Sequence, residues 1–194
     1  MGLSRELKEI QEDLNSKKTS KKIKAIKKVI SYMNLGKNVS SLFFSVMRCL
    51  QFNNIEIKKL VYLYIAQYSR DLPEGAIMAI NSFIQDVKDK HNSMVRAVAV
   101  RAMGCIRVKE LNEYLIDPLK HVLDDKDSYV KKTALLTVPK MFEVTPELIK
   151  KNGIIDMVQK VVKEEKNPVV FAAALDALKE IEEIEDASYV QLDE

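Results

Sequence analysis

The side chains that could carry out chemistry in this 194-residue chain are few and widely separated. The two histidines, His91 and His121, stand apart, and neither a paired-cysteine spacing nor a glycine-rich phosphate loop accompanies them. The two cysteines, Cys49 and Cys105, lie in apolar stretches predicted to be helical, which favours buried structural thiols over a disulfide or a catalytic thiolate. The sequence therefore predicts no enzyme, no catalytic residue, no bound metal and no cofactor.

One acidic cluster, Asp124-Asp125-Lys126-Asp127, is a candidate cation site because it groups three carboxylates. It lacks the glycine and the distal glutamate of a calcium-binding loop. We interpret it as a solvated turn between two helices. Function is then expected to come from surfaces that bind other molecules.

A basic stretch is the clearest candidate for such a surface. Residues 17–37 contain eight lysines and no acidic residue, whereas the net charge of the whole chain is +3. This concentration of charge would attract anionic lipid headgroups, nucleic acid or an acidic protein. Nucleic acid is disfavoured because the stretch contains no arginine and a single aromatic residue, Tyr32. A lysine-rich end that is merely solvated also fits the pattern.

The elements that would position these residues follow from a stripe of small and apolar residues that recurs four times. Each copy has such residues at offsets 0, +3, +4, +7, +8 and +11, which is one face of an α-helix. The spacing between copies is close to the period of HEAT and armadillo repeats. An Asn or Asp three residues before each start is a predicted N-cap. The copies start at Ile57, Val95, Val130 and Val170.

A second set of helices is predicted between these copies, and a shorter, more polar pair is predicted before them, over residues 3–14 and 23–33. One helix pair cannot bury its apolar face alone, so neighbouring pairs are expected to stack. We therefore predict an all-α fold, a right-handed α-solenoid of HEAT/armadillo-like helix pairs, with about five pairs in a single segment over residues 1–194. The second set occupies residues 39–50, 77–87, 111–122 and 154–162, the last after a break at Asn152-Gly153.

The limits of the chain allow two further expectations. No polar capping repeat follows the fourth copy of the stripe, so we expect the carboxyl end to be truncated within a longer solenoid. No stretch approaches 18 uninterrupted apolar residues, and the charged start Arg5-Glu6-Leu7-Lys8 does not fit a signal peptide. A soluble chain in the cytosol is expected.

Several runs of residues resemble the amino-terminal trunk of beta-adaptin, the large beta subunit of clathrin-associated adaptor complexes. The resemblance extends over nearly the whole chain, in order and with few gaps. The longest similar runs are Lys58-Lys-Leu-Val-Tyr-Leu-Tyr64, Ala76-Ile-Met-Ala-Ile-Asn-Ser-Phe83 and Arg101-Ala-Met-Gly-Cys-Ile-Arg-Val108.

This resemblance implies a non-enzymatic scaffold subunit of a heterotetrameric adaptor complex that acts in vesicle-mediated intracellular protein transport. The implied partners are a second large chain, a medium chain and a small chain, with clathrin engaged through regions that this chain does not contain. The implied location is cytoplasmic and peripheral, on the cytosolic face of Golgi, endosomal or plasma-membrane coats. No nucleic acid is expected as a partner.

Two binding surfaces are implied by the same resemblance. Lysines on the first helices of one family form bind phosphoinositide headgroups at the membrane, and apolar residues on early helices of another form receive an activated Arf-type GTPase. Ordinary packing between helices is an alternative explanation for the apolar positions. The matching phosphoinositide-binding positions are Lys18, Lys21, Lys22, Lys27 and Lys28, and the matching GTPase-binding positions are Leu63, Ile77 and Ile80.

The chain also departs from the pattern of the family that it resembles. It lacks a Tyr-Phe pair that covers a cargo-signal pocket in longer members, and Pro139 interrupts a predicted helix that other members continue. A proline there removes one backbone hydrogen bond, so a kink is expected. The rival hypothesis is a soluble helical-repeat scaffold, similar to coatomer or to transport receptors, that binds proteins without lipid.

Overall fold

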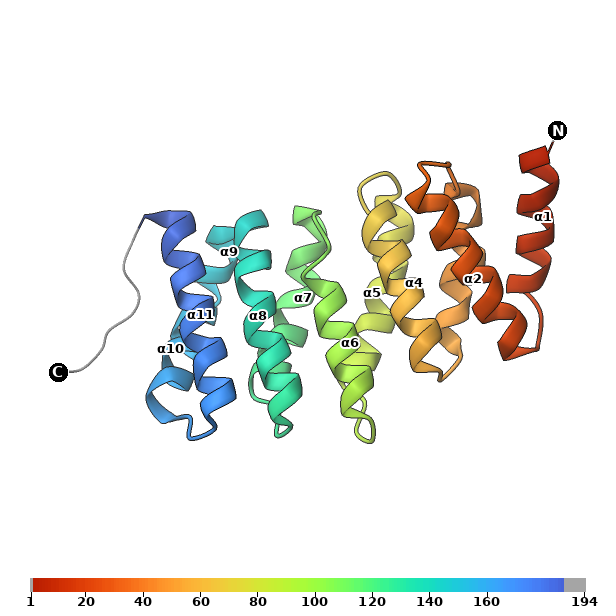
Figure 1. Cartoon of the computed structure of the whole chain (residues 1–194). Coiled ribbons are helices and arrows are strands. Elements are labelled where there is room, and N and C mark those ends of the chain that lie inside the picture. The colour runs from red at the N-terminus through yellow and green to blue at the C-terminus, as the bar shows by residue number, and fades with distance from the viewer. Residues whose placement is uncertain (1, 187–194) are drawn as a thin grey trace. The chain divides into compact units, whose positions relative to one another are not determined.

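The computed structural model describes residues 2–186, and within that range every regular element is helical (Figure 1). Eleven α-helices and two short 3-10 helices follow one another in that range. The α-helices are α1 (Gly2–Leu14), α2 (Thr19–Asn34), α3 (Phe43–Arg48), α4 (Ile55–Tyr68), α5 (Pro73–Val87), α6 (Ser93–Met103), α7 (Lys109–Leu123), α8 (Ser128–Val144), α9 (Pro146–Lys151), α10 (Ile154–Glu164) and α11 (Pro168–Glu185), and the 3-10 helices are η1 (Ser40–Leu42) and η2 (Cys49–Gln51).

The chain divides after Ala79, within α5, into two compact units. In the first unit, α1 packs against α2, and α2 and the α3 segment pack against α4. In the second unit, α6, α8 and α11 pack side by side as one layer, and α7 and α10 form the layer behind it (Figure 1). Each unit is therefore built from stacked helix pairs, as the sequence predicts. The single continuous segment and the right-handed sense of the solenoid stay predictions.

The recurring stripe forms the buried face of α4, α6, α8 and α11. All of its positions are buried except Leu60, which is half-buried. Because burial of one Val, Leu or Ile side chain stabilises a fold by about 1.5–3 kcal/mol, this face is a large source of stability. The starting residues Ile57, Val95, Val130 and Val170 are each 0 or 1% exposed.

The predicted N-caps are also confirmed. Each Asn or Asp has extended backbone geometry, and its side-chain oxygen accepts a hydrogen bond from an amide in the first turn of the helix that follows. For example, the Asn92 side chain accepts from the backbone N–H groups of Met94 and Val95. The capping residues are Asn54, Asn92, Asp127 and Asn167.

Two expectations about the connections have different outcomes. The break at Asn152-Gly153 is confirmed, because Gly153 takes the left-handed conformation, with φ of +71°, and separates α9 from α10. The prediction that both thiols are buried in helices is half wrong. Cys49 is buried in η2, but Cys105 lies exposed in the turn after α6. Its position two residues beyond the last helical residue, Met103, explains that exposure.

The helix containing Pro139 continues through it. α8 runs from Ser128 to Val144, and the proline ring is buried within it. Helix α7 likewise contains a buried proline, Pro118. None of the helices within residues 2–186 is both long enough and apolar enough to cross a bilayer.

Candidate functional site

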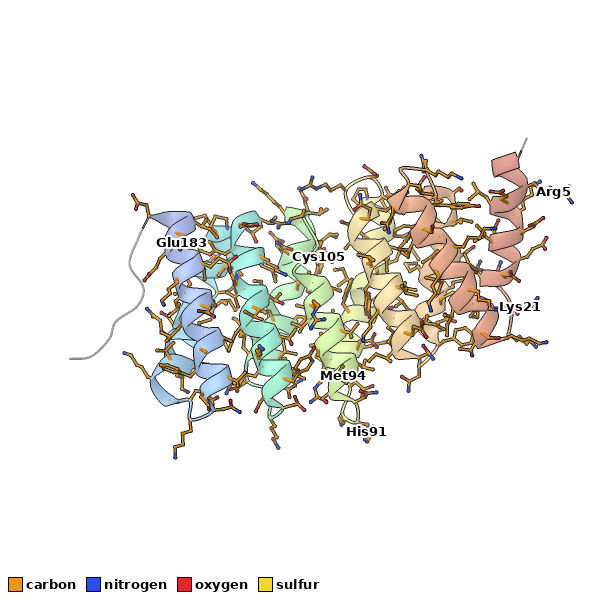
Figure 2. The ribbon with its side chains drawn as sticks, viewed as in Figure 1. Arg5, Lys21, His91, Met94, Cys105 and Glu183 are labelled. Carbon is orange, nitrogen blue, oxygen red and sulfur yellow. The ribbon has the colours of Figure 1, made fainter. Side chains whose placement is uncertain are left out.

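The basic stretch forms helix α2 of the first unit, and its lysines separate onto different faces. Lys21, Lys24 and Lys28 follow one another at spacings of three and four residues, so they share one side of the helix. All three are exposed, as are Lys17 and Lys18 at the start of α2. Figure 2 labels Lys21, whose side chain lies at the solvent-exposed edge of this unit. We call Lys17, Lys18, Lys21, Lys24 and Lys28 the lysine face.

Lys22 does not belong to the lysine face, because its side chain is buried, and its role in binding phosphoinositide stays a prediction. Its side chain is 5% exposed, and the ammonium group donates a hydrogen bond to the carbonyl oxygen of Leu14, the last residue of α1. The same Nζ lies 4.4 Å from the ring centroid of Phe52. A buried ammonium held by a carbonyl and an aromatic ring is a packing element that connects α1 to the neighbouring helices.

Lys27 lies at the edge of the lysine face and already has an acidic partner. Its Nζ lies 2.6 Å from a carboxylate oxygen of Glu56 on α4. Lys21 forms a looser pair with Asp13, at 3.5 Å. Both pairs are solvent-exposed, so each contributes about 0–1 kcal/mol and an incoming anion can compete for the lysine. Lys27 is therefore less available to a ligand than Lys24 or Lys28.

A tyrosine and a glutamate lie at the carboxyl-terminal side of the lysine face. The Tyr32 hydroxyl donates a 2.6 Å hydrogen bond to Glu6, and this bond, assisted by the charges of Lys28 and Lys37, lowers the pKa of Glu6. The same bond raises the pKa of Tyr32. The ammonium of Lys37 lies 4.2 Å from the Tyr32 ring centroid. Glu6 therefore stays ionised near neutral pH and offsets part of the positive charge at this end of α2.

The net charge of the first unit remains strongly positive after these pairs are counted. Residues 1–79 contain 14 Lys and Arg against 7 Asp and Glu, whereas residues 80–194 contain 17 against 21. The first unit therefore attracts anions and the second unit, as a whole, repels them. The sequence prediction missed Lys24, although its spacing from Lys21 and Lys28 could have found it.

The three predicted GTPase-binding positions divide in a similar way. Leu63 on α4 is 50% exposed and Ile77 on α5 is 47% exposed, so both side chains are accessible to a partner. Ile80 is 4% exposed and belongs to the core of its helix pair, so it presents no surface to a partner. The neighbouring Met78, which the sequence prediction did not single out, is 57% exposed. Leu63, Ile77 and Met78 are therefore accessible apolar residues of the first unit.

The acidic turn of the second unit is a structural feature rather than a solvated loop. The guanidinium of Arg96 holds Asp125 with two hydrogen bonds of 2.7 and 3.0 Å, and the Asp125 side chain is 6% exposed. Burial would raise the pKa of Asp125, but the hydrogen bonds from Arg96 and from the Asp127 backbone N–H lower it overall. The interpretation of the whole cluster as solvated is therefore wrong for Asp125. The Asp127 side chain is the N-cap of α8 and accepts hydrogen bonds from backbone N–H groups in its first turn.

Comparison with known proteins identifies the family of this chain. The sequence matches the family described as "Adaptin N terminal region" over residues 3–193. The AP-1 complex subunit beta of Dictyostelium discoideum is 45% identical over 179 residues, which cover 92% of this chain and 19% of that protein. The chain thus spans about a fifth of the length of this relative.

Solved structures agree with the fold. A homology model of the full-length AP-3 complex in an intermediate open conformation matches with a TM-score of 0.67 at 22% identity, covering 90% of this chain and 28% of that one. A designed armadillo repeat protein matches with a TM-score of 0.63 at 18% identity, covering 93% of this chain and 88% of that one. These likenesses confirm the predicted class, an all-α solenoid of helix pairs.

The fold and the family match lead to one classification. The molecule is a helical-repeat protein, and the chain belongs to the adaptin N-terminal region family. The resemblance to beta-adaptin inferred from short runs of residues is confirmed by the AP-1 beta relative.

Proposed function

We propose that this chain is part of the trunk of a beta subunit in a heterotetrameric adaptor complex, where it is a non-enzymatic scaffold in vesicle-mediated protein transport. The 45% identity to an AP-1 beta subunit, maintained over 92% of the chain, is the observation that carries this proposal. Stacked helix pairs provide long, rigid surfaces that suit a scaffold. The proposed partners are a second large chain, a medium chain and a small chain.

The lysine face is the proposed membrane contact. Lys18, Lys21 and Lys28 from the predicted set are joined by Lys17 and Lys24, whereas Lys22 is buried and Lys27 is paired with Glu56. Each lysine near an anionic bilayer contributes about 1 kcal/mol at moderate salt. Five such residues, three on one side of α2 and two directly before it, would hold the first unit on a phosphoinositide-containing membrane, with contacts that weaken as salt rises.

The exposed apolar residues are the proposed contact for an activated Arf-type GTPase. Leu63 and Ile77 keep this assignment because both are about half exposed, and Ile80 loses it because it is buried. Such exposed aliphatic groups gain favourable free energy when a partner removes them from water. Two weak contacts on one chain, to lipid and to GTPase, would together give much tighter recruitment than either contact alone.

The proposed location is the cytosolic face of Golgi, endosomal or plasma-membrane coats, with clathrin engaged through parts of the complex outside this chain. Affinity purification of the cellular protein that contains this chain tests the proposal. Recovery of a medium, a small and a second large adaptor chain in similar amounts is the expected result. Recovery of a transport cargo alone, with no adaptor chain, would instead support a soluble helical-repeat receptor.

The GTPase contact needs a separate experiment. An Arf-type GTPase loaded with a non-hydrolysable GTP analogue is expected to retain the chain on beads, and the same GTPase loaded with GDP is not. Leu63→Asp combined with Ile77→Asp should abolish retention, while Leu136→Asp, at an exposed apolar position of the second unit, should not. Equal retention of all three proteins would remove the GTPase from the proposal.

A further inference from the structure

The second unit has a groove that neither proposed surface uses. One hollow of about 810 Å³ lies among the turn after α5, helix α7 and the turn between α7 and α8. A second hollow of about 330 Å³ lies between the end of α7 and helix α10. Asp124 and Met157 line both hollows, so the two adjoin. We call this feature the Met157 groove.

One end of the Met157 groove is lined by four lysines, Lys88, Lys90, Lys120 and Lys126. In the part of the chain that the structure describes, none of the four ammonium groups takes part in an ion pair. They come from the turn after α5, from α7 and from the turn before α8, in a unit with more acidic than basic residues. The basic end is therefore a local feature and does not reflect the charge of the whole unit.

Two of the three carboxylates that line this hollow, those of Asp89 and Asp125, are committed to the fold, and the third, that of Asp124, is exposed. Asp125 is held by the Arg96 guanidinium, and an Asp89 carboxylate oxygen accepts 2.8 Å hydrogen bonds from the backbone N–H groups of His91 and Asn92. Arg96 also donates a 2.8 Å hydrogen bond to the carbonyl oxygen of Asp89. This network holds the two turns that carry Lys88, Lys90 and Lys126 in fixed positions. The groove is thus preorganised, which lowers the entropy cost of binding.

The rest of the groove has a different chemistry. Met157 and Val161 on α10, with Leu123 at the end of α7, give the second hollow an apolar floor. Methionine is flexible and polarisable, so it can adapt to different aliphatic side chains. Glu164 lies at the far end, where it is paired with Lys160 at 3.9 Å. A ligand along the groove would therefore meet positive charge first, then an apolar floor, then a mixed ion pair.

We infer that the Met157 groove binds an extended acidic segment of another polypeptide, with carboxylates at the four lysines and one aliphatic side chain over Met157. A peptide bound along helices or edges in this way is a recurring mode of recognition. A compact polyanion such as a lipid headgroup fits less well, because it would leave the apolar floor of Leu123, Met157 and Val161 uncovered. This inference does not depend on the proposed function.

Fluorescence anisotropy of the 194-residue chain with a labelled peptide tests the inference. The probe is a peptide of about ten residues, all Glu and Asp except for one central leucine, which spans roughly 30 Å when extended. We expect saturable binding at low salt that weakens as salt rises. A second peptide with serine in place of leucine should bind several-fold more weakly, because it leaves the apolar floor uncovered.

The charge-reversal variant Lys120→Glu with Lys126→Glu should bind the leucine peptide at least about tenfold more weakly. The matched control, Lys163→Glu with Lys179→Glu, makes the same change of net charge at exposed lysines outside the groove and should stay within about twofold. Circular dichroism confirms that both variants are folded, and competition by unlabelled peptide on the unaltered chain provides an independent measure of specific binding.

Three results would overturn the inference. The first is the absence of saturable binding by the unaltered chain at low salt. The second is an equal loss of binding in the control variant, which would mean that the peptide responds only to net charge. The third is binding of phosphoinositide vesicles, but not of the peptide, through Lys120 and Lys126.

Discussion

The two units place a basic residue at the same position of a helix but give it different partners. In the first unit, the lysine four residues after the N-cap donates a hydrogen bond to the helical segment that precedes its own helix. Lys22 donates to the carbonyl oxygen of Leu14, and Lys58 donates to that of Leu50 at 3.2 Å. Both lysines are buried, and in both cases the hydrogen bond satisfies a carbonyl at the end of the preceding helical segment.

In the second unit, the equivalent residues connect one helix pair to the next. Arg96 binds a carbonyl in the turn before α6, as the lysines of the first unit do, but its other donors reach Asp125. Lys131 reaches Glu165 at 2.9 Å. The carboxylates come from the following turn in each case. In the second unit, a carboxylate from the following turn pairs with each of these bases, whereas Lys22 in the first unit is held by a carbonyl and an aromatic ring, and residues 1–79 keep an excess of positive charge.

This difference explains how one fold can carry two kinds of surface. Because a carbonyl group is neutral, the hydrogen bond to Leu14 leaves the positive charge of Lys22 in place. The lysine face keeps most of its positive charge, which favours the proposed contact with an anionic membrane. The second unit instead has ion pairs that connect one helix pair to the next. Its positive charge at the Met157 groove is confined to the lysines that line one end.

The largest expected effect is the loss of the interior ion pair of the second unit. Arg96→Met leaves the Asp125 carboxylate buried without its partner, and breaking such a pair costs about 3 kcal/mol of unfolding free energy. Chemical denaturation of the chain measures the change. Arg107→Met is the control, because the Arg107–Glu143 pair is about 40% exposed and its loss should cost under about 1 kcal/mol. Equal effects of the two changes would contradict the role assigned to Arg96.

Removal of the interior lysine of the first unit should have the next largest effect. Lys22→Met loses a charged hydrogen bond and the contact with Phe52, so we expect a loss of about 1.5–2 kcal/mol. The buried thiol of Cys49 reports opening of this unit through its rate of reaction with a thiol reagent. Lys21→Met, one residue away on the exposed side, should leave that rate unchanged. Faster labelling in Lys21→Met would mean that the two lysines are assigned to the wrong sides.

Substitutions at two helix N-caps, one in each unit, should change the free energy of unfolding by smaller amounts and in opposite directions. Asn92→Ala removes the cap of α6 and should lower the unfolding free energy by about 1 kcal/mol. The N-cap of α2 is Lys18, whose side chain makes no capping hydrogen bond. Lys18→Asn should therefore raise the free energy of unfolding by about 0.5–1 kcal/mol. Thermal unfolding followed by circular dichroism measures both. A destabilising Lys18→Asn would show that Lys18 contributes something other than a cap.

The smallest expected effect is on how strongly the free energy of unfolding depends on acid pH. The hydrogen bonds that Asp125 accepts lower its pKa despite its burial, so its ionised form stabilises the fold above its unfolded-state pKa. That stability is lost as the pH falls through the folded-state pKa, below about pH 4. Unfolding free energies measured from pH 6 to pH 3 should therefore fall more steeply for the unaltered chain than for Asp125→Asn. Parallel curves would show that Asp125 is not ionised preferentially in the folded state.

Much of the fold could be predicted because it depends on local spacing. The stripe that starts at Val95 and its cap Asn92 are read from residues within one or two helical turns, and both are confirmed. The helix pairs follow because each stripe needs a partner of similar length. The exposure of Cys105 was missed because α6 ends at Met103, a boundary that apolar spacing does not define.

The candidate site was predictable only in part. Lys22 lies four residues before the buried Ile26 on the apolar side of α2, so periodicity contains the signal that separates it from Lys21. The partner of Lys22 is a carbonyl oxygen, which the sequence does not display. The Arg96–Asp125 pair joins residues 29 positions apart, and only the stacking of two helix pairs brings them together. Ion pairs between residues so far apart in the sequence can be identified only from the structure.

The most direct test of the account is sedimentation of the chain with phosphoinositide-containing vesicles across a salt series. Lys24→Glu with Lys28→Glu should lower the bound fraction several-fold at low salt, because both side chains belong to the lysine face. Lys163→Glu with Lys179→Glu, which makes the same change of net charge in the second unit, should bind as the unaltered chain does. Vesicle binding that is insensitive to Lys24 and Lys28, or that falls equally in both variants, would contradict the assignment of the lysine face as the membrane contact.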